Sequence, residues 1–178
     1  MKTFKDYPEF KPNLSPHQIL KMGAFGGTYF RPIYSSVTKK HYKSEDVIKE
    51  YPKSWFKGID IDKMVTSSDY DKKVNKYGVK CGTELEDWEK SGWISVGTKD
   101  PYGWFQWYCR FYMGRRTDDD ERQIKRWLKF TGPNGRFKKN LIKKIKENNA
   151  EYDDETISPV IRQSLQHWGY QITPGDLK

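Results

Sequence analysis

Basic side chains that stand next to aromatic rings are the residues of this sequence with the most evident chemistry. The stretch PYGWFQWYCRFYMGRR, from Pro101 to Arg116, contains seven aromatic residues and ends in two arginines. From Arg115 to Lys146 there are twelve Lys and Arg residues against four Asp and Glu residues. Arginine binds phosphate through two donors of its planar guanidinium group, and aromatic rings stack on nucleobases. The pattern therefore predicts a protein that binds nucleic acid, either DNA or RNA.

The basic residues that we expect to contact phosphates lie on or near the helices of this segment. They are Arg110, Arg115, Arg116, Arg122, Lys125, Arg126, Arg136, Lys138 and Lys139. The turn GPNGR, which precedes a lysine-rich helix, is the strongest signal, because backbone amides at a helix start bind anions. Two plainer interpretations stay open: a solvated basic face, and arginines that only satisfy the carbonyl groups at a helix end.

A second hypothesis places a ligand pocket at the loop FGGTYFRP, residues 25–32. Its residues would bind an anion or a nucleotide through amides, hydroxyls and a guanidinium group, or they would only end a helix and turn the chain. The pocket candidates are Gly26, Gly27, Thr28, Tyr29, Arg31, Trp104 and Trp107. The loop matches neither the P-loop nor the dinucleotide-binding pattern. A deep pocket where these residues meet would favour an enzyme that modifies a nucleotide or a nucleobase, because such enzymes hold an extruded base between rings.

The sequence assigns no catalytic residue, no metal site and no cofactor. The three histidines are scattered, and separation in sequence supports neither a Ser/His/Asp nor a Cys/His arrangement. The acids at 118–121 would point around a whole helix turn, so they fit a helix start better than a metal site. Cys81 and Cys109 lack zinc-binding spacing, and we expect both to be reduced thiols. Whether the protein is an enzyme stays open, and a third hypothesis is that it binds an acidic host protein.

Length, composition and periodicity predict a mainly α, compact single domain of about five or six helices, with a short extended segment near residues 28–38. The chain has 178 residues, a net charge of +9 and 16% aromatic residues, so the core must rest on large amphipathic rings. We expect an N-terminal arm at 1–13, a globular domain at 14–172 and a tail at 173–178. No apolar stretch is long enough for a membrane span and no signal peptide is evident, which predicts a soluble cytoplasmic protein without a membrane partner.

Helix signals locate the main elements. Aromatic residues at 104, 105, 107, 108, 111 and 112 follow the spacing of one helix face, and Gly114 would end that helix. This spacing favours a core helix, although an exposed ring of it would also stack on a base. Expected helix starts are Ser15 with Pro16, Thr83 with Glu86 in a capping box, Thr117, and Ser158 with Pro159.

Several unusual aromatic segments carry a resemblance. The segments FGGTYFRPI, GVKCGTELEDWEKSGWI, DPYGWFQWYCRFYMGRRTDDDERQIKRW and SPVIRQSLQHWGY resemble a family of small proteins of bacteriophages and large DNA viruses, with predicted relatives in fungi and plants. The resemblance covers residues 14–170. It implies a single compact domain, and it assigns no activity and no catalytic residue.

Overall fold

Helices make up most of the regular structure in the computed structural model, which describes all residues from 1 to 178. The α-helices are α1 (Pro16–Met22), α2 (Ser44–Ile48), α3 (Ile61–Met64), α4 (Leu85–Lys90), α5 (Trp104–Tyr112), α6 (Asp120–Thr131), α7 (Arg136–Glu147) and α8 (Pro159–His167). The strands β1 (Ile33–Ser35) and β2 (Lys40–Tyr42) form one antiparallel hairpin. The predicted mainly α class is confirmed, and β1 lies inside the segment that the sequence marks as extended.

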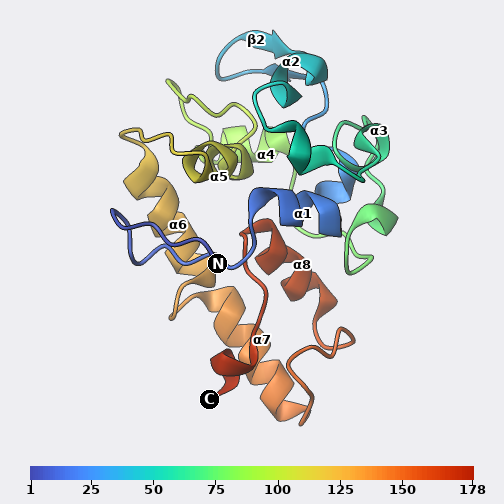
Figure 1. The fold of residues 1–178 in the computed structure, drawn as a ribbon, viewed down its shortest axis with the longest axis vertical. Coiled ribbons are helices and arrows are strands. Elements are labelled where there is room, and N and C mark those ends of the chain that lie inside the picture. The colour runs from blue at the N-terminus through green and yellow to red at the C-terminus, as the bar shows by residue number, and fades with distance from the viewer.

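The elements are arranged along one long axis. Figure 1 shows the hairpin and α2 at one end, and α7 with the C-terminus at the other. Helix α5 lies between these ends, and its side chains Trp107, Tyr108, Cys109 and Phe111 are at most 1% exposed. The aromatic spacing therefore describes a core helix, as predicted. Gly103 precedes α5 and Gly114 follows it. Their φ angles are +99° and +110°, and glycine adopts such positive values without strain.

The N-terminal residues contribute to the main core. Phe4 and Phe10 are buried, and Phe10 has no exposed surface. The ring of Phe10 lies 5.1–6.3 Å from six other rings, four of α5, one of α6 and that of Phe4. A core cluster of 25 buried residues thus joins the start of the chain to its middle.

A second, smaller core joins α7 to α8 and to the C-terminus. It contains Leu141, Ile145, Leu165 and Ile172. A short 3₁₀ turn at Pro174–Leu177 follows, and Asp176 there accepts a hydrogen bond from Tyr170 and pairs with Lys138 at 3.0 Å. The last residues of the chain are therefore packed against the domain.

The helix starts agree with the sequence only in part. At α1, Ser15 and Gln18 form a capping box. At α4 the capping residue is Glu84 with Asp87, and Thr83 instead accepts a hydrogen bond from the indole of Trp88, so the predicted box is wrong by one residue.

Two further starts differ from the prediction. Helix α6 begins after Asp119 and not after Thr117, whose amide and hydroxyl both bond to Asp120. Ser158 precedes α8 with a φ of +51°, and its side chain makes no capping bond.

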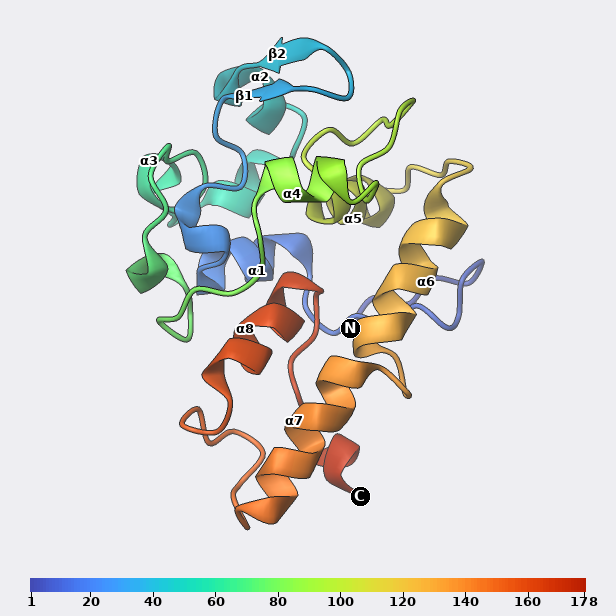
Figure 2. The ribbon, with the colours of Figure 1, turned by 180° about the vertical axis from the view of Figure 1, so that it is seen from behind.

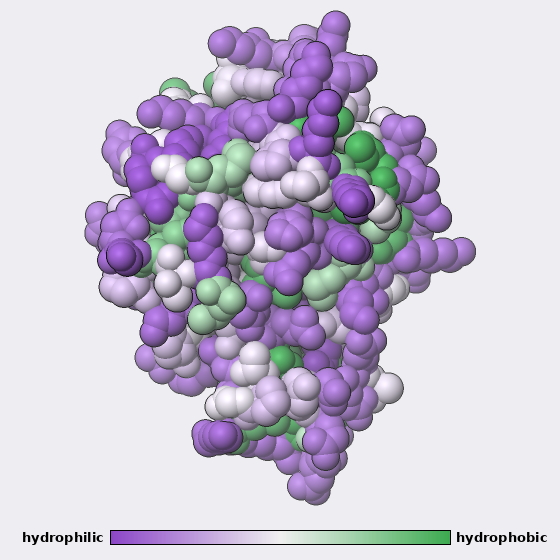
Figure 3. All heavy atoms as spheres, in the orientation of Figure 1, coloured by the Kyte–Doolittle hydropathy of each residue, from purple (hydrophilic) through white to green (hydrophobic).

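The surface on the face of Figure 1 is mostly hydrophilic, with hydrophobic side chains exposed in small groups (Figure 3). No helix has the length and apolar content needed to cross a membrane.

Replacing Phe10 tests the contribution of the N-terminal residues to the core. We expect Phe10→Ala to lower the free energy of unfolding by about 3–5 kcal/mol, because the cavity opens among six rings. Chemical denaturation measures this change. Tyr34→Ala is the control, since Tyr34 is 50% exposed, and its effect should stay below about 1 kcal/mol. Equal stability of Phe10→Ala and the parent would contradict the described packing.

Candidate functional site

A cleft of about 400 Å³ is lined by segments that lie far apart in the sequence. They are the loop after α1, the loop with Ser68 and Tyr70, the segment around α4, the start of α5, the second half of α6, the start of α7, and the end of α8. Figure 2 shows α4, α5, α6, α7 and α8 around this part of the molecule. The volume lies within the range of about 300–1,000 Å³ that is typical of small-molecule sites.

Ten of the 25 residues that line the cleft are Phe, Tyr or Trp. They are Phe25, Tyr29, Tyr70, Trp88, Trp93, Trp104, Phe105, Phe130, Phe137 and Trp168. Trp168 joins two parts of the wall, because its ring lies 4.7 Å from that of Trp104 and 5.0 Å from that of Phe130. Trp104 is held by a hydrogen bond from its indole nitrogen to the carbonyl of Gln123, at 3.2 Å. The wall is therefore built from rings whose positions the core determines.

Gly103 precedes α5 with a φ of +99°, which is unfavourable for any other residue. A Cβ atom at this position would lie 3.4 Å from both Ile94 and Trp88, two residues that line the cleft, and this is ordinary van der Waals contact. The backbone conformation, and not a lack of space, therefore requires the glycine.

Arg126 is the most unusual charged group of the cleft. Its guanidinium lies 5.7 Å from the ring of Trp93 and 5.5 Å from that of Trp168. It donates a hydrogen bond to Oε1 of Gln123 at 2.9 Å, and it has no carboxylate partner within 4.0 Å. Burial, together with the nearby charge of Arg122, lowers the pKa of Arg126 to about 10. The side chain is still a cation at neutral pH, but it is poorly hydrated and unpaired.

Two other arginines of the cleft also lack a carboxylate partner. Arg136 is exposed, and its guanidinium lies 4.7 Å from the ring of Phe130. Arg31 donates to the carbonyl of Thr28 at 3.1 Å. Lys80 is paired with Glu84 at 3.6 Å. The lining therefore carries four cations and one anion, and an anionic ligand would be attracted to it.

Cys81 and His167 meet at the cleft although they lie 86 residues apart in sequence. The distance from Sγ to Nδ1 is 3.6 Å. Nε2 of His167 accepts a hydrogen bond from the amide of Phe25 at 3.1 Å, so in the neutral ring the proton is on Nδ1 and faces the sulfur. Burial raises the pKa of the Cys81 thiol and lowers the pKa of His167 to about 3. His167 is consequently a hydrogen-bond donor to the thiol and not a base for it.

The structure brings together four of the seven pocket candidates. Thr28, Tyr29, Arg31 and Trp104 line the cleft. Trp107 does not, because it is fully buried and donates to Asp120 at 2.8 Å.

The two glycines of the loop are also outside the cleft. Gly26 donates its amide to Asn75, and Gly27 donates its amide to Ala24, so neither group is available to a ligand. A Cβ at Gly26 would collide with the ring of Tyr70. The glycines therefore serve close packing in this loop.

The hydroxyl groups of the loop are likewise used inside the protein. Tyr29 donates to the carbonyl of Tyr102 at 2.8 Å, and Thr28 donates to the carbonyl of Phe25 at 2.9 Å. Of the clamp that the sequence suggests, Thr28, Tyr29 and Arg31 line the cleft, but the two hydroxyl groups already bond inside the protein.

Most of the basic residues expected to contact phosphate are paired with carboxylates. Arg110 bonds to Glu50 at 2.6 Å and shares the buried Asp100 with Arg115. The remaining pairs are Arg116 with Asp6, Arg122 with Asp119, Lys125 with Glu121, and Lys138 with Asp176. Only Arg126, Arg136 and Lys139 have no such partner, and the first two line the cleft.

The histidine and acidic residues form no metal centre. No group of three or more His, Cys, Asp or Glu side chains has the geometry to hold a metal ion. Asp120, in the acidic run, is buried and accepts hydrogen bonds from Trp107 and Thr117. Cys109 is fully buried, and burial raises the pKa of its thiol.

Comparison of the chain with known protein families, with curated proteins and with solved structures finds no match.

The neutral state of His167 predicts a pH dependence of stability. The unfolded chain takes up a proton near pH 6.5, whereas the folded ring does not until about pH 3. The free energy of unfolding should therefore fall by roughly 2 kcal/mol between pH 7 and pH 4.5. The carboxylates with lowered pKa values, Asp6, Asp154 and Asp176, lose their contribution only below about pH 4.

Denaturation curves at several pH values measure this loss. His167→Gln should flatten the profile between pH 7 and pH 4.5, because the titrating group is gone. His41→Gln, at an exposed position, is the control and should keep the profile of the parent. An unchanged slope in His167→Gln would show that other groups cause the acid sensitivity.

Proposed function

We propose that the protein binds nucleic acid, DNA or RNA, through the aromatic cleft. One base would lie among the rings, and its neighbouring phosphates would contact Arg126 and Arg136. The observation that carries the proposal is Arg126, a poorly hydrated cation without a carboxylate partner that lies beside the rings of Trp93 and Trp168.

The energetics of Arg126 favour an anionic ligand. Arg126 is half-buried, and a charge that is partly removed from water without an ionic partner destabilises the folded protein. Its neighbours on α6, Arg122 and Lys125, each have a carboxylate within 4.0 Å. A phosphate would supply the missing charge, and the planar guanidinium binds it through two donors.

The aromatic wall narrows the class of anion. Stacking of a base on a ring contributes about 1–3 kcal/mol. A sugar phosphate would leave the ten aromatic rings of the lining unused, and an uncharged aromatic molecule would leave Arg126 unpaired. A nucleotide carries both a planar ring and a phosphate, so it uses both properties of the cleft.

The ion pairs change which basic residues we assign to phosphate binding. Arg110, Arg115, Arg116, Arg122, Lys125 and Lys138 already have carboxylate partners. A phosphate would have to compete with those partners. We therefore assign the direct contacts to Arg126, Arg136 and Lys139, and we expect the other residues to add only to the long-range field.

An enzyme that modifies a nucleobase is the second candidate. The meeting of Tyr29, Arg31 and Trp104 in one cleft favours it. His167 would not serve as its general base, because both ring nitrogens are already engaged. Mass analysis of oligonucleotides after incubation with the protein tests this candidate, and an unchanged mass for all four bases would argue against it.

Charge removal inside and outside the cleft tests the binding proposal. Arg126→Met and Lys125→Met remove the same charge from the same helix, but only Arg126 lines the cleft. For a labelled single-stranded oligonucleotide we expect Arg126→Met to raise Kd roughly 10-fold or more, and Lys125→Met to raise it less than about 3-fold. Fluorescence anisotropy measures both values.

Salt dependence adds a second readout to the same titration. Two or three phosphate contacts predict a slope of about −2 for log K against log salt. Arg126→Met should reduce that slope by about 0.7. Salt-independent binding, or an equal loss in both variants, would contradict the assignment of Arg126.

We also expect the same two variants to differ in the free energy of unfolding when no ligand is bound. Arg126→Met should raise the free energy of unfolding by about 1 kcal/mol, because an apolar side chain replaces an unpaired cation between two indole rings. Lys125→Met should leave it nearly unchanged, since its ion pair is exposed. Thermal and chemical denaturation compare the two variants. A lower stability of Arg126→Met than of the parent would show that the charge of Arg126 does not destabilise the folded protein.

A further inference from the structure

The hairpin of β1 and β2 carries positive charge that no nearby carboxylate neutralises. Residues 31–43 include four Lys and Arg residues and no Asp or Glu. The segment that follows adds three acids, but two of them, Asp46 and Glu50, already pair with cations. The exposed lysines of the hairpin that have no carboxylate within 4.0 Å are Lys39, Lys40 and Lys43.

Helix α4, beside the hairpin, carries the opposite charge. Residues 84–90 include four acids and one lysine. Glu86, Asp87 and Glu89 have no Lys or Arg within 4.0 Å, and the first two are exposed. The amide of Ser36, in the turn of the hairpin, donates to Oε2 of Glu89 at 3.1 Å and joins the two elements. Two patches of opposite sign thus lie next to each other, although their charges form no ion pair within the chain.

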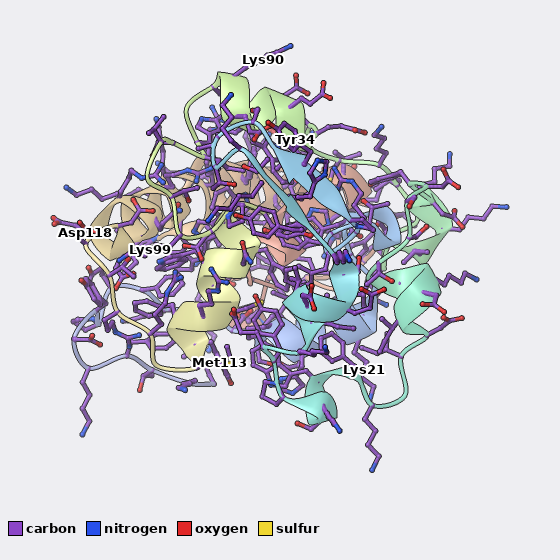
Figure 4. The ribbon with its side chains drawn as sticks, turned by 90° about the horizontal axis from the view of Figure 1, so that it is seen from above. Lys21, Tyr34, Lys90, Lys99, Met113 and Asp118 are labelled. Atoms are coloured by element: carbon purple, nitrogen blue, oxygen red, sulfur yellow. The ribbon has the colours of Figure 1, made fainter.

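Exposed apolar side chains accompany these two patches. Tyr34 of the hairpin is 50% exposed, and Val96, in the loop after α4, is 90% exposed. In Figures 1 and 4 this loop lies beside the turn of the hairpin, and Figure 4 shows Tyr34 beside the helix that ends at Lys90. Specific interfaces bury such apolar groups at their centre and keep charged groups at the rim.

The presence of both signs on one face determines which partner fits it. A polyanion would meet the acids of α4, and a basic protein would meet the lysines of the hairpin, so like charges would repel either one. A second copy of this chain fits both patches. When it is turned by 180° about an axis between them, the lysines of each hairpin lie opposite the acids of the other copy's α4. Such an interface uses the same surface on both copies.

We propose that this face is the interface of a two-fold symmetric homodimer, in which the hairpin of each copy packs against α4 of the other and Tyr34 and Val96 are covered. Residues 31–43 and 84–99 together contain six cations and four acids, so the face is close to neutral and the copies repel each other little there. Eighteen of these residues are exposed, slightly fewer than the 20–30 or so that each partner gives to a standard interface. We therefore expect a weak dimer, with a Kd on the order of 10–100 µM.

Sedimentation equilibrium of the protein without nucleic acid tests the dimer. The concentrations run from about 10 µM to about 500 µM, on both sides of the expected Kd. We expect a monomer at the low end and a dimer at the high end, and a weaker dimer at high salt because exposed charge pairs are screened. A monomer at every concentration would overturn the inference. Oligomers that grow beyond the dimer would also overturn it, since a two-fold interface closes on itself.

Two charge reversals test which patches meet. Lys40→Glu places an acid opposite the acids of α4, and Glu86→Lys places a lysine opposite those of the hairpin. Each change occurs twice in a symmetric dimer, so we expect each variant to raise the Kd of the dimer roughly 10-fold. In an equimolar mixture of the two variants, each altered residue again faces the opposite charge. The Kd of the mixed dimer should therefore return to within about threefold of the parent value.

Lys21→Glu is the matched control. Lys21 is also exposed and has no carboxylate within 4.0 Å, and in Figure 4 it lies on the opposite side of the molecule from Lys90. This variant should dimerise as the parent does, and an equal loss in it would overturn the inference by showing that net charge governs the association. A mixture that does not recover would overturn the pairing of the hairpin with α4. The inference goes beyond the proposed function, because the dimer is measured without nucleic acid, and either proposal can fail while the other stands.

Discussion

Several buried indole and phenol side chains donate their one polar hydrogen to a partner on another segment, and these hydrogen bonds constrain how the elements of this protein pack; the buried hydroxyl of Tyr51 is an exception without a partner. Trp107 donates to Asp120, which fixes the start of α6 against α5. Tyr108 donates to the carbonyl of Leu14 at 2.6 Å, which places the segment before α1. Trp127 donates to the carbonyl of Trp168 at 2.7 Å and so ties α6 to the end of α8. An unpaired polar atom in such a core is costly, so few other arrangements of these helices would satisfy all three.

The same requirement shapes the cleft. The hydroxyl of Tyr29 and the indole nitrogens of Trp88 and Trp104 already have partners inside the protein. The rings therefore present faces and edges to a ligand and few free donors or acceptors. Discrimination between bases depends on hydrogen bonds to their edges, whereas stacking accepts every base. A site with this composition favours binding that tolerates many sequences, with charge and stacking as its main contributions.

Local patterns predict much of the fold, and contacts between distant segments account for what they miss. The spacing of the aromatic residues identifies α5, and Ser15 with Pro16 marks the start of α1. Thr83 has the right type for a cap at α4, but the indole of Trp88 binds its hydroxyl, and Glu84 takes the position. The meeting of Cys81 and His167 has no local signal, because it depends on how α8 packs. Only four of the seven predicted pocket residues line the cleft, because contacts between distant segments, and not local sequence, decide which side chains meet there.

The distribution of charge shows why counting residues along the sequence overstates the basic surface. The segment from Arg115 to Lys146 has a large excess of positive charge, yet the carboxylates of Asp6, Asp100 and Asp176 come from outside it and pair with its cations. Pairing does not remove the net charge of +9, so the whole molecule still attracts polyanions over a distance of about 10 Å at moderate salt. Six of the twelve cations in the segment have a carboxylate partner, and under the proposed function direct contact would fall to the other six: Arg126, Lys129, Arg136, Lys139, Lys144 and Lys146. Because Arg126 and Arg136 lie beside the rings, the long-range field and the short-range contacts of the proposed function would bring a polyanion to the same place.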